Sequence, residues 1–248
     1  MVDWLAATVV ENKRWTSRLH SLRLQADFPD FKAGQFTQLA LAINGEIVSR
    51  PFSLVNAPDD PLLDFYLTEV AGGVLSPHLA SLQAGDELLV AAKASGLLTL
   101  DQVPEEASQL FLLSTGTGMG PFLSMIQTSS IWQQFDKVVL VHAVRWQEEL
   151  SYQDMITAIA RKQAGFSYVP IVSRESSETT LPGRIPQAIE NGTLEQRTGL
   201  KIRAEDSHIM LCGNPAMVQD TMDVLINDRG LRKHSRREPG QISIEKYW

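Results

Sequence analysis

A glycine-rich stretch, "STGTGMGPF", occupies residues 114–122 and directly follows the apolar run "LFLL". Glycine stands at every second position from 116 to 120, and Pro121 closes the stretch. Glycine lets the backbone approach a ligand closely, and the unpaired amides at a helix start favour an anion. Proline suits a first helical turn because its missing N–H costs nothing there. The stretch therefore predicts a phosphate-binding strand-to-helix turn, with an ordinary tight turn as the alternative.

The residues after this turn distinguish among nucleotide ligands. No Gly-Lys-Ser or Gly-Lys-Thr follows the glycines, which excludes a Walker A loop. The spacing also departs from the G-x-G-x-x-G fingerprint of dinucleotide sites. A usual NAD site places an acidic residue at the end of the next strand, against the ribose hydroxyl. Here the next predicted strand, "KVVLVHAVR", ends in Arg145 instead.

Two further arginines follow along the chain. Arg174 comes after Ser173 at the end of the third predicted strand, "IVSRE", and Arg184 lies in "PGRIP". Arginine binds phosphate through paired, charge-assisted hydrogen bonds. Three arginines near strand ends, without an acidic residue at the ribose position, suit a 2′-phosphate better than a free hydroxyl. Together they predict NADP(H) rather than NAD as the ligand.

The only cysteine, Cys212, stands near the end of the last predicted buried strand, in "LCGNP". Open α/β sheets bind ligands at the carboxyl ends of their strands, so we expect Cys212 to lie at the site. A buried structural thiol is the alternative. The five histidines are scattered, and no cluster of His, Cys, Asp or Glu has metal-ligand spacing, so no metal site is predicted.

The elements that must position these residues fall into two groups. Residues 1–100 read as short alternating segments separated by turn residues, and Asn44-Gly45 is a strong hairpin signal. Such a pattern indicates an antiparallel β-barrel or sandwich. The stretch "SPHLASLQ" at 76–83 predicts a short helix with Ser76 as its N-cap and Pro77 in its first turn.

From residue 101 the pattern changes. Apolar strands now alternate with helical stretches, which is typical of a parallel α/β sheet with crossover helices. The sequence therefore predicts two domains, an antiparallel β-barrel over 1–100 and a parallel-sheet nucleotide-binding α/β domain over 101–248.

Composition limits the classes of function. Of the 248 residues, 44% are hydrophobic and 21% are charged, which is typical of a globular chain. The single cysteine excludes an internal disulfide and suggests a reducing compartment, and no run approaches the roughly 20 apolar residues of a membrane span. We therefore expect a cytoplasmic protein without a membrane segment.

Charge gives a second limit. The net charge of −7 argues against nucleic-acid binding. Positive charge is nevertheless concentrated in "RGLRKHSRR" at 229–237 and in a smaller group at Lys13, Arg14 and Arg18.

Five motifs occur in an order that resembles the ferredoxin–NADP⁺ reductase family. They are "RPFS", "GGVLSPHL", "GTGMGP", "VSRE" and "CGNP". The length and the ending "KYW" resemble the compact bacterial branch of that family, the flavodoxin/ferredoxin–NADP reductases, and the match runs from about residue 4 to the last residue. The resemblance implies an N-terminal antiparallel β-barrel that carries FAD and a C-terminal domain that binds NADP(H).

The resemblance also implies roles for the residues of the first motif. Arg50 contacts the FAD pyrophosphate, Phe52 stacks on the isoalloxazine, and Ser53 donates a hydrogen bond near its N5 atom. The family usually has tyrosine where this chain has Phe52, preceded here by Pro51. The stacking contact survives this change, but the hydroxyl and its hydrogen bond are lost.

Further contacts are implied by the same resemblance. Those expected around FAD are Tyr66, Leu67 and Thr68 beside the flavin and adenosine; Gly73, Val74, Leu75 and Ser76 at the pyrophosphate; and Tyr247 and Trp248 over the other flavin face and the adenine. Thr115 and Gly116 are expected to face the flavin and the nicotinamide. Those expected around NADP(H) are Thr117, Gly118, Pro121, Val144, Arg145, Ser173, Arg174, Arg184, Gly213 and Asn214. Cys212 is expected beside the nicotinamide, and Ser53, Cys212 and Trp248 are the predicted catalytic residues.

The activity implied is a flavoenzyme oxidoreductase. Hydride passes from nicotinamide C4 to FAD N5, and single electrons then pass to a ferredoxin or flavodoxin. An acidic partner would dock on local positive charge, and the expected residues are Arg14, Arg18, Arg232, Lys233, Arg236 and Arg237. We expect a monomer. Two alternatives remain, an NADPH-dependent reductase of free flavin, quinone or another small acceptor, and a non-catalytic nucleotide-sensing subunit.

Overall fold

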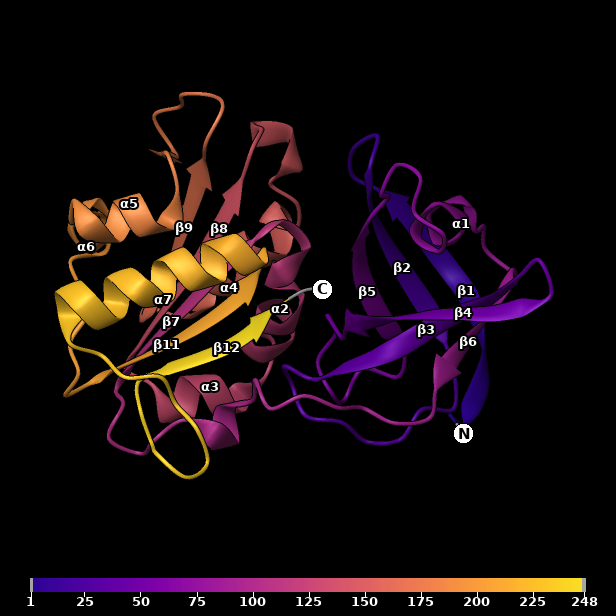
Figure 1. Ribbon diagram of the computed structural model, residues 1–248, viewed down its shortest axis with the longest axis horizontal. Helices are drawn as coiled ribbons and strands as arrows, with labels where there is room; N and C mark the ends of the chain where they lie inside the picture. The colour runs from indigo at the N-terminus through magenta and orange to yellow at the C-terminus, as the bar shows by residue number, and fades with distance from the viewer. Residues whose placement is uncertain (1, 247–248) are drawn as a thin grey trace. The chain divides into compact units, whose positions relative to one another are not determined.

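The computed structural model describes residues 2–246 and groups the chain into two compact units (Figure 1). The first unit comprises the residues up to Thr99 together with Gly120–Thr128. The second unit comprises Leu100–Met119 and the residues from Ser129 onward. The chain therefore enters the second unit, returns to the first for one short segment, and then enters the second unit again.

The first unit is built on a six-stranded antiparallel sheet with the order β4-β3-β6-β1-β2-β5. Its strands are β1 (Trp4–Arg14), β2 (Leu19–Gln25), β3 (Phe36–Ile43), β4 (Glu46–Ser53), β5 (Leu63–Thr68) and β6 (Glu87–Ala91). The two edge strands meet because Leu54, just after β4, bridges to Phe65 of β5. This closure confirms the predicted antiparallel barrel.

Local sequence explains how this sheet forms. Asn44 and Gly45 both adopt left-handed backbone angles, with φ of 53° and 83°, which a tight hairpin turn requires. The turn pairs Ile43 with Glu46 and sets the register of β3 against β4. Along β2, Leu22 and Leu24 point inward and are fully buried, as a period of two demands. The predicted hairpin is confirmed.

One short helix, α1 (Ser76–Ser81), packs on the barrel through Leu79. The predicted N-cap at Ser76 is wrong, because the cap residue is Leu75 and no side chain caps the helix. The Ser76 hydroxyl instead accepts a hydrogen bond from the Val70 amide at 3.0 Å. Ser76 therefore closes the preceding turn rather than the helix.

The second unit contains a six-stranded parallel sheet with the order β10-β9-β8-β7-β11-β12. Its strands are β7 (Gln109–Thr115), β8 (Lys137–Val144), β9 (Phe166–Val172), β10 (Leu181–Pro182), β11 (Ser207–Gly213) and β12 (Ile242–Lys246). Every residue of β11 is buried, as expected for a parallel strand covered on both faces. The predicted parallel α/β sheet is confirmed.

Short helices connect these strands. They are α3 (Ser129–Gln134), α4 (Gln153–Lys162), α5 (Ile185–Glu190), α6 (Thr193–Thr198) and α7 (Pro215–Arg229), with 3₁₀ turns η1 (Leu100–Gln102), η2 (Gly116–Met119) and η3 (Gln147–Glu149). Helices α5, α6 and α7 share a buried core with the sheet, and Figure 1 shows α5 and α7 across one face of it. The helix α2 (Gly120–Ile126) belongs to the first unit.

Residues 2–246 lack two features. No helix among them is long and apolar enough to cross a membrane. No group of three or more His, Cys, Asp or Glu side chains among them could hold a metal ion.

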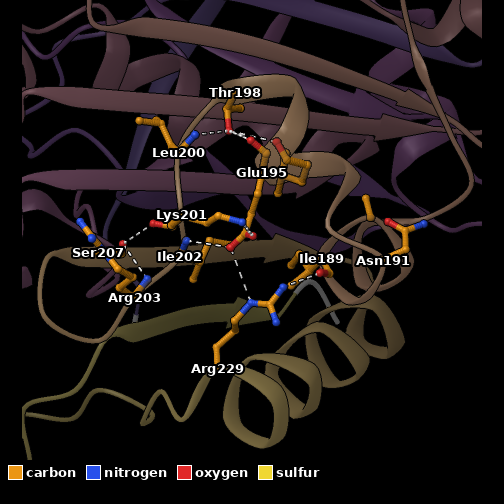
Figure 2. Close-up of polar contacts among 12 residues, drawn as sticks. Ile189, Asn191, Glu195, Thr198, Leu200, Lys201, Ile202, Arg203, Ser207 and Arg229 are labelled. Carbon is orange, nitrogen blue, oxygen red and sulfur yellow. Dashed lines mark hydrogen bonds and ion pairs between the residues drawn. The ribbon is translucent and has the colours of Figure 1, made fainter.

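A buried carboxylate joins three segments of the second unit (Figure 2). The Glu195 side chain of α6 is only 7% exposed, and it accepts hydrogen bonds from Lys201 Nζ at 2.9 Å and the Ile202 amide at 3.0 Å. Arg229 Nε, at the end of α7, lies 3.7 Å from Glu195 Oε1. Burial raises the pKa of Glu195, but these hydrogen bonds and the Arg229 charge outweigh it and hold the pKa below its ordinary value.

We therefore predict that Glu195→Gln lowers the free energy of unfolding at neutral pH by about 2 kcal/mol, because an amide does not replace a charge-assisted acceptor. A lowered pKa gives stability that is present above the ordinary carboxyl pKa and lost as the pH falls through the folded value. The difference between the variant and the unaltered protein should therefore shrink in acid. Urea unfolding at several pH values measures it, with the exposed neighbour Glu190→Gln as the control. Equal losses in the two variants would contradict this role.

Candidate functional site

The glycine-rich stretch forms a turn in which backbone lies directly against backbone. Residues Gly116–Met119 form the 3₁₀ turn η2, and Gly116 has a left-handed φ of 52°. A Cβ atom on Gly118 would lie 2.6 Å from Gly213 Cα and 2.7 Å from the Cys212 carbonyl oxygen. No side chain fits at Gly118, so the turn after β7 packs directly on the end of β11.

A hydrogen bond continues this contact. Thr115 Oγ1, at the end of β7, accepts the Asn214 amide at 2.9 Å. The Asn214 side chain in turn caps α7 by accepting the Ala216 amide at 2.9 Å. The structure thus brings together five predicted site residues at the carboxyl ends of two adjacent parallel strands: Thr115, Gly116, Gly118, Gly213 and Asn214. Cys212 is fully buried beside them.

A histidine that sequence reasoning missed is associated with the Gly116 turn. His142 of β8 is fully buried, and burial lowers its pKa to about 4 against an opposing effect of the Gly116 backbone. The imidazole is therefore neutral at pH 7. Its signal in the sequence was a polar residue inside the apolar strand "KVVLVHAV".

The arginines at the strand ends are exposed and without ion-pair partners among the described residues. The Arg174 amide donates to the Arg145 carbonyl at 3.0 Å, which joins the ends of β8 and β9. The Arg174 guanidinium lies 5.5 Å from the ring centre of Trp146, a side chain that is 39% exposed. Arg184 stands directly before α5. The structure therefore joins Arg145 with Arg174, whereas Arg184 is placed at the start of α5.

Two nearby carboxylates are engaged by backbone amides rather than by these arginines. Glu149 Oε2 accepts the amides of Arg145 at 2.8 Å and Trp146 at 3.0 Å. Glu175 Oε2 accepts the Gln147 amide at 2.6 Å. The carboxylates fix the turn after β8, and the guanidinium groups stay available for an anion. Val144 is buried beneath this edge, where its carbonyl accepts the Ser173 amide at 3.1 Å.

Glu245 of β12 is another residue that sequence reasoning did not identify. It stands opposite Cys212 in the parallel pairing of β11 with β12. Burial raises the pKa of Glu245 to about 7, so this carboxyl exchanges a proton near neutral pH. The sequence signal was weak, because one glutamate near a chain end is common on a surface.

In the first unit the predicted residues gather where the barrel closes. Ser53 is buried at the end of β4, Phe52 is half-buried, and Arg50 and Pro51 are exposed. On β5, Tyr66 and Leu67 are buried and Thr68 is half-buried. The Leu54–Phe65 bridge brings the ends of these two strands together.

The turn before α1 supplies exposed backbone. Gly72 has a left-handed φ of 72°, and the Gly73 amide donates to the Val70 carbonyl at 2.8 Å. Val74 is 54% exposed and Leu75 is buried. An exposed glycine turn and an exposed Arg50 each suit a dinucleotide phosphate, and a half-buried Phe52 suits a flat ring, so these residue types fit FAD. The predicted contacts Tyr247 and Trp248 lie outside the described residues.

The second unit fits NADP(H) on the same grounds. Gly118 and Gly213 leave bare backbone at the ends of β7 and β11, and Arg145 and Arg174, without ion-pair partners among residues 2–246, stand at the ends of β8 and β9. Thr117 is half-exposed in the turn and Pro121 is buried in the helix that follows.

Comparison with known proteins gives the same two parts. The chain matches the oxidoreductase FAD-binding domain family over residues 7–94 and the oxidoreductase NAD-binding domain family over residues 112–223. It is 45% identical to the flavodoxin/ferredoxin–NADP reductase of Escherichia coli (strain K12) over 249 residues, covering all of both chains. It is 36% identical to the ferredoxin–NADP reductase of Azotobacter vinelandii, covering 93% of this chain and 89% of that one.

A solved structure agrees with these matches. The structure of a ferredoxin NADP⁺ reductase from Neisseria gonorrhoeae with bound FAD and NADP superposes with a TM-score of 0.94. It is 33% identical in sequence, and the alignment covers 99% of both chains.

We predict that Gly118→Ala lowers the free energy of unfolding by about 3 kcal/mol, because its Cβ atom forces the backbone of β11 away. Gly116→Ala should lower the free energy of unfolding by only about 1 kcal/mol, because its Cβ atom meets open space and only the left-handed backbone angle is unfavourable for alanine. Denaturant unfolding of both variants gives the comparison. If Gly118→Ala proved no more destabilising than Gly116→Ala, the backbone contact would be refuted.

Proposed function

This chain belongs to the ferredoxin–NADP reductase family, and from that premise we propose that it transfers electrons between NADP(H) and a ferredoxin or flavodoxin. The observation that carries the proposal is the match to flavodoxin/ferredoxin–NADP reductases over the whole length of both chains. We propose residues 1–100 as the FAD-binding region and 101–248 as the NADP(H)-binding region. FAD, when bound, accepts hydride from the nicotinamide and releases electrons singly, as an iron–sulfur partner requires.

The chain's own residues bind and orient the two cofactors. We assign the NADP(H) phosphates to the backbone turn at Gly116 and Gly118 and to the arginines at the strand ends. We assign the flavin ring to Phe52 and Ser53 and the FAD phosphates to Arg50 and the Gly72–Gly73 turn. Cys212 and Ser53 would exclude water at the reacting edge of each cofactor. The other contacts implied by the family resemblance remain part of this proposal, including Tyr247 and Trp248.

The arginine assignment predicts a specific loss of cofactor preference. Arg174→Ala should raise the KM for NADPH roughly tenfold to a hundredfold, because a charge-assisted contact with the 2′-phosphate is removed. The KM for NADH should barely change, since NADH has no 2′-phosphate. Arg161→Ala, which removes an exposed arginine of α4, is the control. An equal loss for both cofactors would refute the assignment.

We further propose that an acidic protein partner docks on local positive charge. The loop after α7 carries Arg232, Lys233, Arg236 and Arg237, all exposed. The loop is ordered, because the His234 amide donates to the Ile242 carbonyl at 2.7 Å and the Gln241 amide to the Arg232 carbonyl at 2.8 Å. In the first unit, Arg14 and Arg18 are exposed and hydrogen-bonded to backbone carbonyls. Preordered positive charge in either unit, on a chain of net charge −7, favours encounter with an acidic partner.

Turnover with two acceptors tests both the docking surface and the small-acceptor alternative. Arg236→Glu should lower kcat/KM with a ferredoxin about tenfold at low salt and leave turnover of an uncharged quinone unaffected. Added salt should slow the unaltered protein with the ferredoxin only. Lys162→Glu is the matched control, because it makes the same charge change on α4. Preference for the quinone, with a flat salt profile for the ferredoxin, would favour a reductase of small acceptors.

Two predictions about the setting of the protein complete the proposal. The single cysteine supports a cytoplasmic location. A monomer is expected, and sedimentation of the purified protein measures it. NADPH oxidation by that purified protein would exclude the non-catalytic alternative.

A further inference from the structure

The helix α2 begins where the glycine turn of the second unit ends, yet it packs within the first unit. All seven of its residues are buried. The Ser124 hydroxyl, fully buried, donates to the Asn56 carbonyl at 2.6 Å. Gln127 Nε2, just after the helix, donates to the Val55 carbonyl at 2.8 Å. Two side chains of the α2 segment are therefore hydrogen-bonded to two consecutive carbonyls of the barrel.

The barrel segment that receives these bonds follows Ser53 directly. It is fixed on its other side, because the Leu54 amide donates to the Gln35 carbonyl at 3.0 Å and the Val55 amide to the Asp64 carbonyl at 2.9 Å. Asn56 is 1% exposed, and its Oδ1 atom accepts the Asp64 amide at 2.9 Å. Residues 54–56 thus have little freedom to move relative to the strands.

Apolar packing holds α2 in the same place. Phe122, Leu123 and Met125 are fully buried. Gly34, with a left-handed φ of 99°, has no room for a side chain, because a Cβ atom would meet both the Leu98 carbonyl and the Met125 side chain. Packing alone leaves a helix free to rotate or slide slightly, whereas the two hydrogen bonds specify its register along the barrel.

We infer that Ser124 and Gln127 are positioning residues that fix the register of α2, the segment that directly follows the NADP(H)-binding turn, against residues 54–56 of the barrel. This inference rests on the proposed function and deepens it. Hydride transfer requires the reacting atoms to come within about 3–3.5 Å, and a displacement of about 1 Å can cost roughly a hundredfold in rate. The turn and α2 are continuous at Gly120, so loosening the register of α2 loosens the downstream end of the turn.

Two variants and one control test this inference. Ser124→Ala removes the buried hydroxyl. Gln127→Met removes the amide donor at an exposed position, where we expect the variant to fold. Thr198→Ala is the control, because it removes a hydroxyl that donates to the Leu194 carbonyl at 3.0 Å within α6 of the second unit. FAD content, NADP⁺ affinity and thermal unfolding are measured for each.

The first readout is hydrogen exchange of the peptide covering residues 114–122 in the FAD-loaded protein without NADPH. We expect faster exchange in both variants and no change in Thr198→Ala. The second readout is the rate of flavin reduction at saturating NADPH in anaerobic stopped-flow measurements. We expect it to fall about tenfold or more in both variants, with FAD content and NADP⁺ affinity unchanged.

Unchanged exchange and an unchanged rate in both variants would overturn the inference. A slower rate that simply tracks lost FAD or a lower melting temperature would also overturn it, because the bonds would then be structural only. If NADPH failed to reduce the flavin of the unaltered protein, the proposed function would fail, and the exchange readout would still decide whether Ser124 and Gln127 hold the turn.

Discussion

The structure depends on one contact between bare backbones, where Gly118 meets Cys212 and Gly213 at the carboxyl ends of β7 and β11. A side chain at Gly118 would separate the two strand ends, and the Thr115–Asn214 hydrogen bond would be lost with them. The contact places the start of α7 beside the turn. A helix start favours an anion, which supports the phosphate site that we propose.

The charge at the ends of β8 and β9 depends on the hydrogen bonds that two nearby carboxylates accept. Glu149 and Glu175 accept backbone amides and hold the turn after β8. Because those carboxylates are engaged, Arg145 and Arg174 have no ion-pair partner within the part of the chain that the structure describes, residues 2–246. Beneath this edge of the sheet the side chains of Cys212 and His142 are buried, and burial lowers the pKa of His142 to about 4, so its imidazole is neutral at pH 7. Exposed arginines beside buried side chains suit the proposed ligand, whose phosphates are charged and whose ring is not.

Features encoded locally could be predicted from the sequence. The Asn44-Gly45 hairpin, the buried parallel strands and the glycine turn depend on residues close together in the chain, and the structure confirms them. Features that depend on tertiary packing could not. The grouping of α2 with the first unit rests on Ser124 reaching a carbonyl 68 residues away. The raised pKa of Glu245 depends on burial in the folded protein. The Ser76 hydroxyl accepts the Val70 amide instead of capping α1, and the sequence pattern around Ser76 did not reveal this hydrogen bond.

The central claim is that one chain holds a flavin and a phosphorylated nicotinamide so that electrons pass between them. The visible absorption spectrum of the purified protein, recorded anaerobically before and after NADPH is added, tests it most directly. A yellow protein whose flavin absorption is bleached by NADPH is the predicted result. A colourless protein that takes up no added FAD, or a bound flavin that NADPH leaves oxidised, would contradict the account.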